Sequence, residues 1–163
     1  MSILDKMFIG LDFKWSSEGL KVSRAFETLD KQIVQVGFFQ GEMRKPKKGE
    51  RRPASLGEVA AYNEFGTSRI PPRPFMGKAM EKNYDNIREE MKTASANITK
   101  GGDAMMQLNR LGEKGKSMVQ TSIRDGGWTP NAPATVKKKG SSRPLIDTGQ
   151  MWQSVHHRVK EKG

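Results

Sequence analysis

Every second position in residues 7–15 is apolar, the spacing of a β-strand that buries one face. Two serines follow, Ser16 and Ser17, and either can cap the start of a helix. Apolar residues at helical spacing then run through residues 22–33, and residues 33–39 are a β-branched and aromatic run. The first quarter of the chain therefore predicts a strand, a helix and a second strand.

The next part of the chain predicts a short helix and a break. Residues 56–65 carry most of their apolar side chains on one helical stripe, and Gly66 follows where a left-handed C-cap would end the helix. Pro71, Pro72 and Pro74 cannot lie in a helix interior. We expect an extended link over these prolines.

Two long amphipathic helices are expected after the link. One covers residues 76–98 and the other residues 105–123, with Gly101 and Gly102 between them. Such a short glycine break predicts an antiparallel helix pair. Residues 125–143 are rich in glycine and proline and are predicted to be a loop.

The C-terminal part predicts a brief helical turn, capped by Asp147 or Thr148, and a last strand within residues 153–159. The fold expected from these elements is a single α+β domain covering residues 1–163. Its small antiparallel sheet, of three to five strands, would pack against two long helices and one or two shorter helices. Long basic loops, expected to be mobile, would complete the domain at about residues 40–55 and 125–144.

Three segments occur in an order that resembles one protein family. Glu64-Phe65-Gly66-Thr67 ends the first short helix, Ile70 to Phe75 reads I-P-P-R-P-F, and Pro144 to Met151 reads P-L-I-D-T-G-Q-M. Together they resemble the head-tail connector, or tail-completion (neck), proteins of tailed bacteriophages, which are related to tail-terminator and virion-morphogenesis proteins. The resemblance extends over the 94 residues from Glu58 to Met151.

The resemblance implies a structural virion protein and no enzyme. Its members form a ring, sixfold by the family pattern, that joins the filled head to the tail or completes the upper end of the tail. The implied partners are further copies of the chain, neighbouring connector or stopper proteins, tail-terminator or tail-tube proteins, and packaged DNA in the channel. The implied location is the virion neck, after assembly in the host cytoplasm.

The segment around the first two motifs also offers material for a contact between subunits. The candidates are aromatic side chains that can anchor a contact and charged side chains that can pair across it: Tyr62, Glu64, Phe65, Arg73 and Phe75. The alternative is that this segment only turns the chain and that Arg73 pairs with Glu64 inside one subunit. We interpret the run from Asp147 to Gly149 as a capped turn.

Charge is concentrated in two segments. The chain has a net charge of +11, and residues 40–55 hold six bases against two acids while residues 135–144 hold four bases and no acid. The candidate contacts to DNA phosphates or to an acidic partner are Arg44, Lys45, Lys47, Lys48, Arg51, Arg52, Lys137, Lys138, Lys139 and Arg143. The alternative is that these charges only keep two loops solvated. No aromatic residues alternate with them, so base stacking is not indicated.

No residue pattern indicates catalysis, a cofactor or a metal site. His156 and His157 would point to opposite faces of a strand, so they are poorly placed to bind one metal ion. No phosphate-binding loop or activated serine motif occurs, and the chain has no cysteine. No run of 18 apolar residues and no signal-like N-terminus is present, so neither a membrane span nor secretion is expected.

Five of the ten methionines fall at helix core spacing. They predict core packing, with an adaptable binding groove as the alternative. The preferred function remains a ring-forming neck protein, and the alternative from another class is a free, basic nucleic-acid-binding protein.

Overall fold

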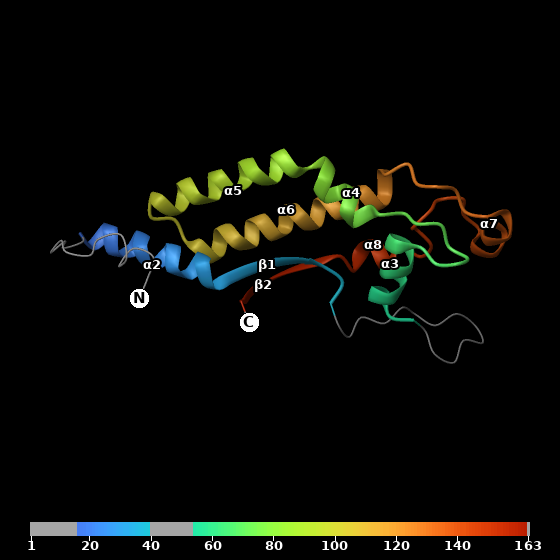
Figure 1. Cartoon of the computed structure of the whole chain (residues 1–163), viewed down its shortest axis with the longest axis horizontal. Coiled ribbons are helices and arrows are strands. Elements are labelled where there is room, and N and C mark those ends of the chain that lie inside the picture. The colour runs from blue at the N-terminus through green and yellow to red at the C-terminus, as the bar shows by residue number, and fades with distance from the viewer. Residues whose placement is uncertain (1–15, 40–53, 163) are drawn as a thin grey trace.

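The computed structural model describes residues 16–39 and 54–162. Over these ranges the chain has an elongated α+β fold, with helix α2 (Ser17–Lys31) at one end and the short helix α7 (Pro133–Lys139) at the other (Figure 1). The expected fold class is confirmed. The strand predicted at residues 7–15 lies outside the described residues, and so do the basic side chains in residues 44–52.

The sheet joins the two ends of the described chain. Strand β1 (Gln32–Gly37) pairs antiparallel with β2 (His156–Glu161), and Val34 lies opposite Val159. Within the described ranges the sheet has these two strands, fewer than the three to five that we expected. Side chains in β2 alternate between exposed and half-buried from His156 to Lys160, which confirms that this strand covers the helices with one face only.

Helix α2 begins as the sequence predicts and ends at Lys31, two residues before the end of the predicted apolar spacing. Ser16 is its N-cap, and the Ser16 hydroxyl accepts a hydrogen bond of 3.1 Å from the backbone N–H of Gly19. The helix then runs without a loop into β1. None of its residues is fully buried, so α2 extends beyond the body of the protein (Figure 1).

Helix α6 (Ala104–Asp125) is the central element, with the sheet on one side and helix α5 (Tyr84–Thr99) on the other (Figure 1). Two glycines allow the close approach to the sheet. A β-carbon at Gly112 would lie 2.6 Å from Cγ of His157, and one at Gly115 would lie 2.9 Å from Cγ2 of Val36. The antiparallel α5–α6 pair is as predicted, with Gly101 at a φ of 89° in the turn between the helices.

The helix predicted over residues 76–98 is wrong in one respect, because it is broken at Asn83. Helix α4 (Phe75–Lys82) precedes the break and α5 follows it. Asn83 has a ψ of 13°, and its side-chain amide donates a hydrogen bond of 2.8 Å to the carbonyl of Ala79. An asparagine that bonds to the preceding turn competes with the helical backbone, and the apolar spacing does not reveal this.

The C-terminal third contains two further differences from the prediction. The segment predicted as loop contains α7, which starts with Pro133 at its first turn and ends at Gly140 with a φ of 72°. The brief helical turn, α8 (Gln150–Gln153), is present, but its N-cap position is Gly149 and no side chain caps it. The predicted cap by Asp147 or Thr148 is therefore wrong.

The core lies where helix α3 (Leu56–Phe65), α4, α6 and α8 meet. Its buried members are mostly aliphatic and come from these four helices and the residue before β2: Leu56, Ala60, Phe75, Ala79, Val119, Ile123, Met151 and Val155. Half-buried side chains of β1 and of residues 128–152 pack around them. This core joins Phe75 of the second motif to Met151 of the third.

Candidate interaction surface

The link between α3 and α4 is a rigid turn. Gly66 ends α3 with a φ of 76° and a ψ of 175°, so the predicted break is confirmed, although its ψ differs from that of a left-handed cap. The Thr67 backbone N–H donates to the carbonyl of Ile70 at 2.9 Å, and the Thr67 hydroxyl accepts from the Ile70 N–H at 3.1 Å. A β-carbon at Gly66 would lie 3.0 Å from the Ile70 carbonyl, so this turn needs glycine both for its conformation and for its space.

Glu64 connects the end of α3 to the start of α4. Its two carboxylate oxygens accept hydrogen bonds of 2.9 Å from the backbone N–H groups of Met76 and Gly77. A carboxylate at a helix N-terminus satisfies free donors and favours the helix dipole. The alternative that Glu64 pairs with Arg73 is therefore wrong, because its carboxylate caps α4.

Arg73 holds a different segment, the one that follows α6. The side chain is 4% exposed, and it donates to Asn63 Oδ1 at 3.3 Å, to the Thr129 carbonyl at 2.9 Å and to Asn131 Oδ1 at 3.2 Å. A fourth bond of 3.4 Å reaches the carbonyl of Pro130. All four acceptors are neutral, and burial lowers the pKa of the Arg73 guanidinium. The planar fork of arginine thus fastens residues 129–131 to α3.

Phe75 has no exposed surface and lies in the centre of the core. Its ring packs edge to face against Phe38, with centroids 6.2 Å apart and an angle of 87° between the planes. Phe75 and Arg73 were candidates for a contact between subunits. Because both are buried within one chain, neither side chain is available to a neighbouring copy.

The third motif segment packs against the same core. Leu145 and Ile146 contact it and Met151 is part of it. Leu145 has a φ of 60°, a conformation that a bulky residue keeps only where its surroundings hold it. Asn131 connects the two ends of this region, since it accepts from Arg73 and donates to the carbonyl of Arg143 at 3.3 Å. The motifs that are separate in sequence therefore form one structural unit.

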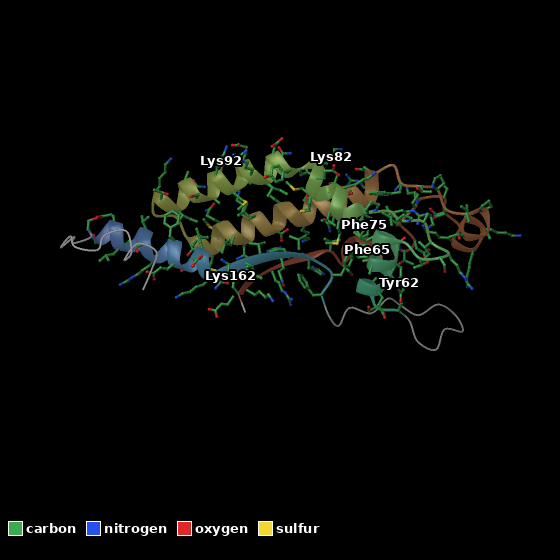
Figure 2. All side chains as sticks on the ribbon, viewed as in Figure 1. Tyr62, Phe65, Phe75, Lys82, Lys92 and Lys162 are labelled. Carbon is green, nitrogen blue, oxygen red and sulfur yellow. The ribbon has the colours of Figure 1, made fainter. Side chains whose placement is uncertain are left out.

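Tyr62 and Phe65 remain on the surface of α3 (Figure 2). Phe65 is 81% exposed and Tyr62 is 45% exposed. Helix α3 holds them rigidly, because Ser55 and Glu58 form a reciprocal capping box at its start and Glu64 anchors its end. These two aromatic side chains are the members of the predicted contact set that can reach another molecule.

The second basic segment forms the end of the molecule opposite α2 (Figure 1). Lys137 and Lys138 are exposed in the last turn of α7, and Arg143 is exposed beyond it. Lys139 instead turns back, and its Nζ donates to the carbonyl of Arg143. Three cations thus point outward from α7 and the turn after it. The mobility expected for this segment stays a prediction.

An apolar groove of about 560 Å³ lies between α2, β1, α4, α5 and α6. We call it the methionine groove, and the residues that characterise it are Leu29, Ile33, Met80, Ile87, Met91 and Met118. Met91 is 57% exposed and Met80 is 39% exposed, so the prediction of core packing is wrong for both. The alternative of a groove lined by methionines describes these two residues better, because Met80 and Met91 line this surface.

The histidine pair is arranged as expected. His156 is exposed, whereas His157 faces α6, where its Nδ1 lies 3.4 Å from Glu113 Oε1 and its Nε2 lies 3.2 Å from Asn109 Oδ1. In the parts of the chain that the structure describes, no group of three or more histidine, aspartate or glutamate side chains could hold a metal ion. Among the helices in the same ranges, none combines the length and apolar character needed to cross a membrane.

The chain was compared with protein families, curated proteins and solved structures, and none of them matches.

Proposed function

We propose that this protein is a structural subunit of a bacteriophage neck. In this proposal each copy is one member of a closed, sixfold ring that joins the filled head to the tail or completes the upper end of the tail. The ring works by binding its neighbours and not by catalysis. It is assembled in the host cytoplasm and resides at the head-tail junction of the virion.

The observation that carries the proposal is the convergence of the three motif segments. Glu64 caps the helix that starts at Phe75, Arg73 holds Asn131, and Asn131 holds the segment that leads to Pro144. The motif segments that resemble the neck proteins thus make the contacts that hold this fold together. This convergence is what supports the proposal.

The partners follow from the exposed surfaces. Tyr62 and Phe65 offer apolar contacts to a further copy, and the cations of α7 suit an acidic neighbour or the phosphates of DNA in the channel. Neighbouring rings would be connector, stopper, tail-terminator or tail-tube proteins.

Native mass spectrometry at moderate salt tests the ring directly. We expect a single closed oligomer, either for the chain alone or after addition of its neighbours from the virion. A monomer that remains monomeric with every virion component would refute the proposal. The measurement needs no assumption about which surface forms the contact.

The role of α7 is tested in assembled particles. Lys137→Glu combined with Lys138→Glu keeps the contact of Lys139 with Arg143 and reverses two exposed charges. We expect loss of head-tail joining or of DNA retention. Lys92→Glu with Lys162→Glu is the matched control, because it changes the net charge equally at two other exposed sites and should leave assembly intact.

A free nucleic-acid-binding protein is the second candidate, and the exposed cations of α7 are the observation that favours it. It predicts a monomer or dimer that binds duplex DNA tightly. Its affinity would fall steeply with salt, because each phosphate contact releases counterions. Binding assays on the isolated chain between about 50 and 200 mM salt separate the two candidates, since a ring subunit is expected to bind DNA weakly when alone.

A further inference from the structure

Strand β1 has an edge that is open to a further strand. Among the described residues, β1 pairs with β2 along one edge and with no strand along the other. A free edge presents backbone N–H and C=O groups that can pair with an extended segment. We propose that this edge receives residues 7–15 of a neighbouring copy of the chain. The inference rests on the proposed function and specifies its subunit contact.

The two strands of the sheet differ in charge. Proteins protect exposed sheet edges with charged side chains, which disfavour pairing with another chain. Strand β2 follows this rule, since Arg158, Lys160 and Glu161 are charged. Strand β1 contains no charged residue. The free edge of β1 is therefore the edge that lacks protection.

A groove of about 790 Å³ lies between this edge and α3, and we call it the edge groove. Every residue from 34 to 39 lines it, and such a continuous run marks an edge because neighbouring side chains of a strand point to opposite faces. On the α3 side, Gly57, Ala60 and Ala61 are small and leave space, and Phe65 offers an apolar surface that is 81% exposed. A strand edge that faces a helix across a groove suits the addition of an extended segment.

The two faces of the sheet determine what an added strand must look like. On the inner face Val36 packs against α6, and on the outer face Gln35 accepts a hydrogen bond of 2.9 Å from Arg158. An added strand should therefore be apolar on one face and polar on the other. In residues 7–15 all odd positions are apolar, and the even positions after residue 8 are small or charged: Gly10, Asp12 and Lys14.

The direction of α2 assigns this segment to a neighbouring copy. Helix α2 runs without a loop into β1 and extends away from α3, so Ser16 lies at the end of the molecule (Figure 1). The 15 residues of α2 span about 22 Å. Residues 7–15 span about 30 Å when extended, so a segment that folded back along α2 would reach only the start of β1. The edge groove at residues 34–39 of the same chain is out of reach.

This contact joins unlike surfaces, because each copy gives one segment and receives another. Every dimer then keeps one free segment and one free groove. Such a contact continues from copy to copy and closes into a ring when the rotation between copies permits it. The exchange thus supplies the kind of contact that a ring requires.

Variants of the donated segment test the pairing from one side. Leu11→Glu places a charge on the face that would pack inward, between residues 9 and 13. Phe8→Glu is the matched control, because it makes the same kind of change on the face that would point to solvent. Both sites lie outside the helices and strands of the structure, so neither change should unfold them.

A variant of the groove tests the pairing from the other side. Ala61→Glu fills the groove from an exposed position of α3 that is compatible with glutamate in a helix. Met106→Glu is its matched control, since Met106 is 61% exposed on α6 and does not line the edge groove. Thermal unfolding followed by circular dichroism checks that all four variants remain folded.

We expect wild type, Phe8→Glu and Met106→Glu to form the same oligomer in native mass spectrometry. Leu11→Glu and Ala61→Glu should each be monomeric, with self-association weakened by at least about 30-fold. An equal mixture of these two variants should form a dimer and nothing larger, because it contains one intact segment and one intact groove that match.

The outcomes separate this inference from the proposed function. A wild-type ring that Leu11→Glu or Ala61→Glu also forms would overturn the inference and leave the neck proposal standing. A mixture that stays monomeric would overturn the inference as well, because the two surfaces would then not be partners. A wild-type chain that stays monomeric with every virion component would overturn both.

Discussion

Phe65 and Phe75 are the same residue type in two neighbouring motifs, yet the structure gives them opposite environments. Phe75 is fully buried and Phe65 is 81% exposed. A buried phenylalanine removes roughly 150–250 Å² from water, and its replacement by alanine costs about 3–5 kcal/mol including the cavity. The edge-to-face contact with Phe38 contributes about 1 kcal/mol of this loss. We expect Phe75→Ala to lower the free energy of unfolding by about 4 kcal/mol and Phe65→Ala to change it by less than about 0.5 kcal/mol.

Urea unfolding at a protein concentration where the chain is monomeric measures both values. With a slope of about 2 kcal/mol per molar urea, Phe75→Ala should shift the midpoint by about 2 M. Because a loss of this size could unfold the chain entirely, Phe75→Leu serves as a milder variant with an expected loss of about 1–1.5 kcal/mol. Equal losses for Phe65→Ala and Phe75→Ala would refute the division of the motif into a buried and an exposed aromatic residue.

Three further substitutions probe other contacts. Gly112→Ala should destabilise the chain by about 1–3 kcal/mol in urea unfolding, because its methyl group would overlap the ring of His157, and no loss would contradict the close packing of α6 on β2. Arg73→Met should cost about 2–4 kcal/mol by the same assay, since four acceptors lose their donor. Ser55→Ala should cost about 1 kcal/mol through loss of the cap. The backbone N–H and then the hydroxyl of Ser55 lower the pKa of Glu58. The ionised Glu58 carboxylate therefore stabilises the folded chain above its ordinary pKa of 4.5, and this stabilisation is lost as the pH falls through the lowered pKa. Urea midpoints between pH 3 and 6 should fall less steeply toward acid for Glu58→Gln than for wild type.

Local patterns predicted most of the elements in the described ranges. The helices α2, α5 and α6 and both strands follow from apolar spacing, Ser16 caps α2 as predicted, and Gly66 marks the end of α3. The errors have local causes that apolar spacing does not record. Asn83 bends the chain through its own side-chain bond, and α7 buries no residue, so it has no apolar stripe to reveal it.

The candidate surface was predicted only in part. The motifs indicated five contact candidates, but some of these side chains are buried and others are exposed. Burial depends on which distant segments pack around each residue. Arg73 is buried because it donates hydrogen bonds to residues 129–131, and Glu64 is a helix cap because it accepts from the N-terminus of α4. Neither partner segment is close in sequence, so no local pattern could have assigned these roles.

The sequence by itself determined the class of the fold, the order of most of the described elements and the concentration of positive charge, because spacing, capping and composition act over a few residues. Only the tertiary structure decided which motif side chains face solvent. It also brought the three motif segments into one core and left the methionine groove open between α2, β1, α4, α5 and α6. These features depend on contacts between residues far apart in the chain, and the physical reason is that burial and complementarity belong to the packed molecule and not to any one segment.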